Sequence, residues 1–200
     1  TWFSSNGYGS VNAQTDYVGY GAADSDPFSF GAGNYNFQIV QQIAGNADLT
    51  KFGYYTGAGV GKALTESLGA GSTGPVSQTI SESFGLYMSA PVQWRNPTSA
   101  TWFTDRAENN AAQVGATQTN TGGDPQALIY KLSQSEWLVA WEDLNYANTT
   151  SGQSDHDYND AYLKITSTPT VTPEPVSMAL FGLGAGALGL KRLRCNKKTS

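Results

Sequence analysis

Short segments in which apolar and polar residues alternate restrict the fold of this chain more than any other feature. Before residue 170, no window longer than ten residues repeats its apolar positions at helical spacing. Phe84, Leu86 and Met88 share one face of their segment. We expect strands at residues 36–45, 52–56, 84–88, 101–104, 127–132, 137–141 and 161–165. Strands at this spacing, joined by Gly-, Ser-, Thr- and Asn-rich segments, predict an all-β fold, either an antiparallel β-sandwich or a jelly roll.

The length of the chain fits one domain with a short appendage. A chain of 200 residues allows one domain of ordinary size. We divide the chain into an N-terminal arm or edge strand at 1–35, a β-sandwich at 36–168 and a separate C-terminal segment at 169–200. Charged residues make up only 14% of the chain, which excludes a coiled coil and most helical bundles. The single cysteine, Cys195, excludes a disulfide framework within the chain.

Opposite charges are separated along the sequence. Residues 1–190 contain six basic and 16 acidic side chains, a net charge of −10, whereas the last ten residues contain five basic side chains and no acidic one. An acidic body repels phosphate groups, so nucleic-acid binding is disfavoured.

The C-terminal segment joins a Pro-rich break to an apolar run. Residues 171–175 read VTPEP, and residues 176–190 carry no charge. A helix over this run would be about 22 Å long, shorter than the ~30 Å hydrocarbon core, but flanking residues and long basic side chains can extend it. We expect a short transmembrane helix at 176–190 with its basic end in the cytoplasm. The alternative is a buried core helix, although such a helix seldom ends in five basic residues at a chain terminus.

These parts, in this order, resemble the PEP-CTERM sorting signal. The resemblance rests on Pro173, Glu174 and Pro175, on the apolar run, and on the basic cluster with Lys191, Arg192 and Arg194. Such signals occur on exported proteins of Gram-negative bacteria that make exopolysaccharide. The resemblance implies that an exosortase, a membrane protease or transpeptidase, recognises the precursor in the inner membrane. The product would then lie at the outer surface or in the extracellular matrix. Because export needs a secretory signal, we expect that one was removed before Thr1 or that the chain is a fragment.

Residues 141–160 hold a dense group of carboxylates without any Lys or Arg. Unpaired like charges repel by about 1 kcal/mol at 4 Å even in water, and a hard divalent cation with oxygen ligands would neutralise them. The spacing of Asp155, Asp157 and Asn159 matches the start of an EF-hand loop. However, Asp160 and Thr166 stand where that loop needs Gly and Glu, so the EF-hand interpretation fails.

A hairpin would bring both acidic ends of this segment together. The strand that ends at Trp141 would deliver Glu142, and the residues before Ala161 would begin the returning strand. We predict a structural Ca²⁺ site, with ligands drawn from Glu142, Asp143, Asp155, Asp157, Asn159 and Asp160, and with Asp105 as a weaker candidate. The alternative is that these carboxylates accept backbone N–H groups and hold a long hairpin without a metal.

The same segment resembles the closing signature of an uncharacterised bacterial β-sandwich family. That signature is an aromatic-Glu-Asp-Leu turn followed by Asp-x-Asp-Tyr-Asn-Asp, here 141–144 and 155–160, and residues 84–87 and 102–105 are also similar. The family occurs in secreted and surface proteins, often just before such sorting signals. The resemblance implies a calcium-stabilised sandwich and no particular activity.

We do not expect an enzyme. His156 is the only histidine and lies in the acidic loop, and the only cysteine lies in the tail. A secreted hydrolase would need a carboxylate pair drawn from Glu66, Glu82, Glu136 or Glu142. We predict an exported cell-surface or biofilm-matrix protein with a structural or adhesive role. The alternative is a module that binds extracellular polysaccharide, in which Trp2, Trp94 or Trp102 stacks on sugar rings; against this alternative stands burial in the core, which is the favoured interpretation for Trp102.

Overall fold

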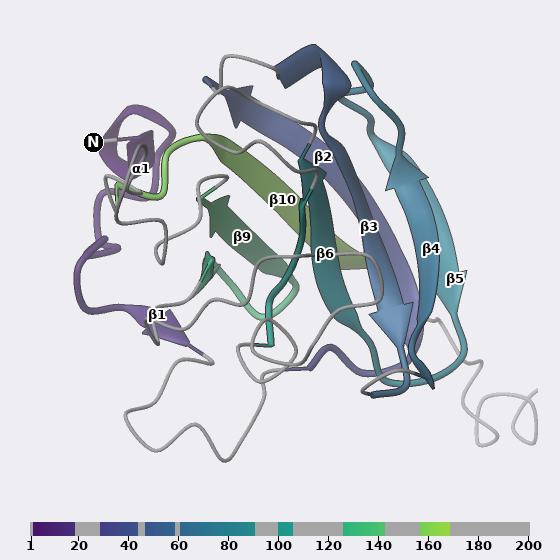
Figure 1. The fold of residues 1–200 in the computed structure, drawn as a ribbon. Coiled ribbons are helices and arrows are strands. Elements are labelled where there is room, and N and C mark those ends of the chain that lie inside the picture. Colours follow the sequence, from purple (N-terminus) through teal and green to yellow (C-terminus); the bar gives the residue numbers. More distant parts are fainter. Residues whose placement is uncertain are drawn as a thin grey trace, which may run out of the picture. The chain divides into compact units, whose positions relative to one another are not determined.

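The chain forms two antiparallel β-sheets (Figure 1). The computed structural model describes residues 2–18, 29–43, 47–58, 61–90, 100–105, 126–142 and 157–168. The first sheet has the order β1 (Tyr17–Val18), β8 (Ala127–Lys131), β9 (Glu136–Trp141), β10 (Ala161–Thr168), β2 (Gly33–Gln42) and β5 (Val76–Ile80). The second has the order β4 (Ala63–Leu68), β3 (Lys51–Thr56), β6 (Gly85–Ala90) and β7 (Ala100–Phe103). The helices described are α1 (Trp2–Ser5) and the 3-10 turn η1 (Ala47–Leu49). The prediction of an all-β sandwich is confirmed.

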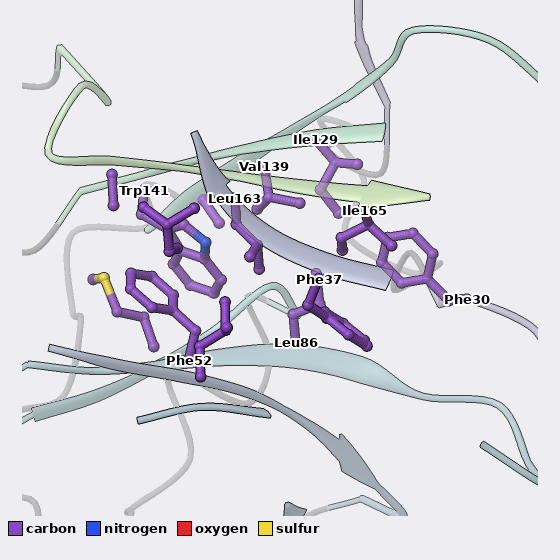
Figure 2. Packing of buried hydrophobic residues seen from close by; sticks show 14 of the residues in the cluster. Phe30, Phe37, Phe52, Leu86, Ile129, Val139, Trp141, Leu163 and Ile165 are labelled. Atoms are coloured by element: carbon purple, nitrogen blue, oxygen red, sulfur yellow. The ribbon is translucent and has the colours of Figure 1, made fainter. Parts of the chain in front are cut away.

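The main core fills the space between the two sheets. Figure 2 shows Trp141 and Leu163 of the first sheet opposite Phe52 of the second. The rings of Phe52 and Trp141 lie 6.3 Å apart. Phe37 on β2 and Leu86 on β6 belong to the same buried cluster. These residues occupy alternate positions on their strands, so the period of two that predicted the strands also forms the core.

A second apolar layer covers the outer face of the first sheet. Leu138 and Ala140 point away from the sandwich core, yet both are buried. They pack against the arm, which we define as residues 2–18, and chiefly against Phe3. Figure 1 shows α1 and β1 on the side of β9 and β10 that faces away from β3 and β6. β9 is therefore covered on both faces, which explains its unbroken apolar run WLVAW.

Two strands escaped the sequence prediction, β4 and β5. Each lies at the edge of its sheet, and neither alternates apolar and polar residues, because β4 reads ALTESL and β5 reads VSQTI. In β5 the polar side chains pair across the sheet, because Ser77 Oγ donates to Asn36 Oδ1 at 2.6 Å and Thr79 Oγ1 donates to Asn34 Oδ1 at 2.7 Å. Edge strands of this kind carry little hydrophobic pattern, so alternation of apolar residues does not reveal them.

The C-terminal segment forms a unit of its own, Pro169–Ser200, apart from Thr1–Thr168. Its residues, including the predicted helix at 176–190 and the predicted sorting signal, lie outside the described part of the chain. Among the helices that the structure does describe, none combines the length and apolarity needed to cross a bilayer.

Candidate functional site

The predicted hairpin between the last two strands is present. β9 and β10 pair antiparallel, with Trp141 opposite Ala161. Glu142 directly follows Trp141, and Asp160 directly precedes Ala161, so the backbone brings these two acidic residues to the same end of the hairpin. Asp143, Asp155 and His156 fall outside the described residues.

Glu142 is the most deeply buried acidic residue that the structure describes, with 1% of its surface exposed. Its backbone N–H donates to the carbonyl of Gln126 at 3.0 Å, and the Gln126 side-chain amide donates back to the Glu142 carbonyl at 3.2 Å. The β8–β9 pairing thus extends one step past both strands. Gln126 is also buried, and nothing in the sequence distinguished it, because one Gln before an apolar run is not a motif.

The residues before β10 form a tight polar turn. The backbone N–H of Asn159 donates to Asp157 Oδ1 at 3.1 Å, and the Asn159 side-chain amide donates to Asp157 Oδ2. Between them, Tyr158 has a φ of 49°, in the left-handed region. The carbonyl of Asp160 accepts a hydrogen bond from the Ile43 N–H at 2.8 Å. The turn is therefore attached to the end of β2 as well as to β10.

The predicted metal ligands that the structure describes do not form a cluster of three or more charged ligands. Within the described part of the chain, no three His, Cys, Asp or Glu side chains come close enough together to hold an ion. Asp105, the weaker candidate, follows β7, which belongs to the second sheet rather than to the hairpin. The predicted ligands Asp143 and Asp155 fall in residues 143–156, which lie outside the described residues.

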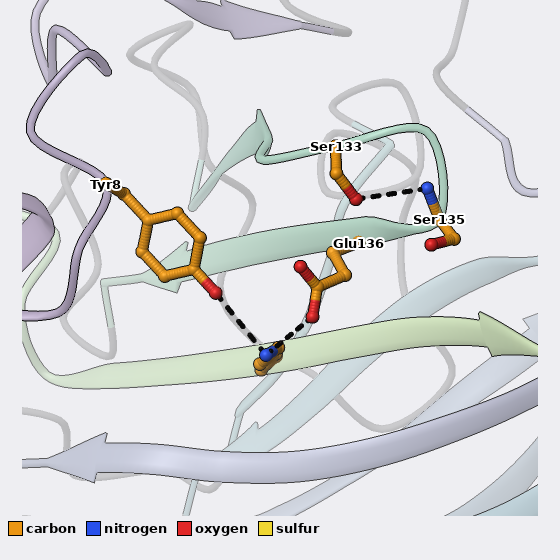
Figure 3. Close-up of polar contacts among 5 residues, drawn as sticks. Tyr8, Ser133, Ser135 and Glu136 are labelled. Atoms are coloured by element: carbon orange, nitrogen blue, oxygen red, sulfur yellow. Dashed lines mark hydrogen bonds and ion pairs between the residues drawn. The ribbon is translucent and has the colours of Figure 1, made fainter.

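Glu136 and Glu66, two of the candidates for a hydrolase carboxylate pair, each form an ion pair with a lysine. Glu136 Oε1 lies 2.7 Å from Lys164 Nζ, and Figure 3 shows Tyr8 of the arm contacting the same ammonium group. The hydrogen bond from Lys164 to Glu136 is the main reason why the pKa of that lysine is raised. Glu66 Oε2 lies 2.9 Å from Lys51 Nζ. These contacts fasten strands and the arm together.

The tryptophans proposed for sugar stacking have different positions. Trp102 is 1% exposed and belongs to the core, so its ring has no face open to a sugar. Trp2 is partly buried, and its ring stacks on Tyr8 with centroids 6.0 Å apart. Trp94 lies outside the described residues.

Comparison of the chain with protein-family models, with curated proteins and with solved structures finds no match.

Proposed function

We propose that this chain is an exported cell-surface or extracellular-matrix protein whose β-sandwich is stabilised by Ca²⁺ and serves a structural or adhesive role. Export is supported by the order of Pro173-Glu174-Pro175, the apolar run and the basic end. A helix at 176–190 would hold the precursor in the inner membrane until an exosortase processes it. The long hairpin would be the part of the sandwich that calcium organises.

The burial of Glu142 carries the calcium proposal. Its side chain is withdrawn from water at the end of the hairpin where Asp160 begins the return. Withdrawing a carboxylate from water costs several kcal/mol unless positive charge, hydrogen bonds or a proton compensate for it. Ca²⁺, which binds six to eight oxygen ligands, would supply positive charge to the carboxylates of residues 141–160, a segment that contains no Lys or Arg.

Oxygen donors from both ends of the hairpin would hold the ion. Glu142 and Asp160 are placed by the strands, and Asp143 and Asp155 would contribute from the segment between them. Asn159 orients Asp157 through two hydrogen bonds, which prepares that carboxylate as a neighbouring ligand. When bound, the ion would neutralise like charges and cross-link the ends of the hairpin, a structural contribution rather than a catalytic one.

Thermal unfolding in calcium and in chelator tests this proposal. The full chain is melted in CaCl₂ and in EGTA, with Glu142→Gln as the test variant and Glu82→Gln, an exposed residue elsewhere, as its matched control. Calcium at 100 times its Kd adds about 2.7 kcal/mol, which is about 5–10 °C in Tm for a domain of this size. The wild type and Glu82→Gln should show this rise, and Glu142→Gln should lose it.

Identical melts in calcium and in chelator would overturn the calcium proposal. Glu142→Gln would then change Tm equally in both solutions, as expected if the carboxylates only accept hydrogen bonds. The sorting proposal has a separate test. In a host that contains an exosortase, the wild type should be shortened, while replacement of Pro173, Glu174 and Pro175 by alanine should leave a full-length membrane-bound chain.

A further inference from the structure

A pocket lies between the arm and the outer face of the first sheet. It has a volume of about 390 Å³, within the usual range for small-ligand sites. Its floor consists of outward-facing side chains of three neighbouring strands, namely Leu128, Tyr130, Ala140 and Tyr162. We call it the tyrosine pocket.

The arm and residues 157–158 form the walls of the tyrosine pocket. One wall is the arm, where the Tyr130 hydroxyl donates to the carbonyl of Ala13 at 2.7 Å and Tyr17 pairs with Tyr130 between β1 and β8. The other wall is Asp157 and Tyr158. Tyr158 holds the left-handed conformation noted above, which is unfavourable for a bulky side chain. Such strain is concentrated at functional sites, where the surrounding structure maintains it.

Aromatic rings meet at steep angles around the pocket. Tyr130 is edge-on to Phe3, with centroids 4.8 Å apart and planes at 65°, and to Tyr17, at 6.3 Å and 89°. Burial, together with Tyr162 and Tyr17, raises the pKa of Tyr130 to about 12, so its phenol is neutral at physiological pH. Asp157 and Tyr162 line the same pocket, so this carboxylate lies near the floor of the pocket.

The charge of the pocket determines which ligands it suits. Among the described residues that line it, Asp157 is the one with a formal charge, and Gln14 adds a neutral amide. Phosphates and carboxylates would meet a charge of their own sign. Ring faces and a carboxylate together attract cations, most strongly where water is displaced.

We propose that the tyrosine pocket binds an organic ammonium group, with Asp157 as its counter-ion and the tyrosine rings around its alkyl substituents. An amino sugar or a choline-type head group could supply this chemistry. The proposal goes beyond the calcium-stabilised sandwich and requires no metal. Because Asp157 is also one of the predicted calcium ligands, calcium and an ammonium group would compete for it, so ammonium binding is tested with calcium removed.

Binding of matched charged and neutral probes tests the proposal. The full chain is kept in EGTA and titrated with choline and its neutral analogue 3,3-dimethyl-1-butanol, and with glucosamine and glucose, while binding is followed by NMR. At least one ammonium compound should bind about tenfold or more tightly than its neutral counterpart. Preference confined to glucosamine identifies an amino sugar, and preference confined to choline identifies a choline-type head group.

Two variants assign the binding to this pocket. Asp157→Asn should weaken ammonium binding about tenfold, while Asp48→Asn, the same change at an exposed residue of η1 outside the arm and the pocket lining, should not. Ala140→Leu, which fills the pocket from its floor, should abolish binding, with an unchanged circular dichroism spectrum showing that the fold persists. Equal affinity for charged and neutral probes, equal effects of the two Asp→Asn changes, or no binding of either ammonium compound would each overturn the proposal. Since Glu142 is untouched and calcium is absent, these outcomes are independent of the calcium test.

Discussion

Gly53 shows how one residue without a side chain shapes the second sheet. It lies opposite Tyr87 in the β3–β6 pair, and the Tyr87 ring covers its backbone. A Cβ at position 53 would lie 2.6 Å from a ring carbon of Tyr87 and closer still to the carbonyl oxygen of Thr65. Two positions further along the same strands the arrangement is reversed, with the Tyr55 ring over Gly85. In both pairs an aromatic ring covers a cross-strand glycine.

Gly53→Ala should therefore destabilise the protein. Because the backbone carbonyl of Thr65 cannot move without disturbing the β3–β4 pair, we expect a loss of about 1–3 kcal/mol in urea unfolding. Gly31→Ala is the matched control, since a Cβ there meets nothing within 4 Å, and it should change stability by less than about 0.5 kcal/mol. Equal effects of the two changes would contradict this packing argument.

The raised pKa of Tyr130 makes the free energy of unfolding fall at alkaline pH. Its pKa is about 12 in the folded protein and about 10 in the unfolded chain, so between these values the folded state keeps a proton that the unfolded state has lost. The free energy of unfolding is therefore unaffected below pH 10, and falls by up to about 2–3 kcal/mol as pH rises to about 12.

Tyr130→Phe separates this titration from the hydrogen bond to Ala13. At pH 8 the variant should be less stable by about 1 kcal/mol, because the 2.7 Å bond is lost. At pH 10–12 the stability difference between wild type and variant should shrink or reverse. The wild type loses stability there because folded Tyr130 keeps its proton, whereas phenylalanine does not titrate. Urea unfolding at several pH values measures both effects, and a difference that stays constant with pH would contradict the assignment.

At the scale of elements, the arm is ordered by burial rather than by helix propensity. α1 has only four residues, too few for a stable isolated helix. It is held because Phe3 packs against Tyr130, Leu138 and Ala140 on the outer face of the first sheet. The contact of Tyr8 with Lys164 adds a polar attachment beside the ion pair with Glu136.

Phe3→Ala should remove most of this anchoring. We expect a loss of about 2–4 kcal/mol, because truncation of a buried aromatic leaves a cavity against the sheet. Leu64→Ala provides a control, since Leu64 is 49% exposed on the edge strand β4. This change should lower the free energy of unfolding by less than about 0.5 kcal/mol. Chemical denaturation compares the two variants, and Phe3→Ala should also speed amide hydrogen exchange in β8. A stability loss for Phe3→Ala no larger than the control's would show that the arm contributes little.

At the scale of the whole molecule, β10, the last of the described strands, joins the two parts of the first sheet. β10 lies between β9 and β2, and it pairs Leu163 with Val139 on one side and with Ile39 on the other. The first sheet thus depends on residues far apart in the sequence. Its central strand, β10, is the last of the described strands along the chain.

Truncation at two neighbouring positions tests this dependence. A chain that ends at Thr168 keeps every described strand and should melt like the full chain. A chain that ends at Asp160 lacks only β10 among them, and it should be unfolded, because β9 and β2 lose their shared partner and the core loses Leu163 and Ile165. Circular dichroism and NMR dispersion distinguish the two states. A cooperative melt of the shorter chain would contradict a central role for β10.

The sequence by itself determined the all-β fold, seven of the strands and the β9–β10 hairpin, because alternation and turn residues act between near neighbours. It also indicated that Glu142 and Asp160 would approach each other. Only the tertiary structure decided which apolar residues face the arm rather than the sandwich core, and that Glu142 is withdrawn from water. The edge strands and the tyrosine pocket also belong to this second group. These features arise where segments distant in sequence pack together, and local periodicity contains no information about that packing.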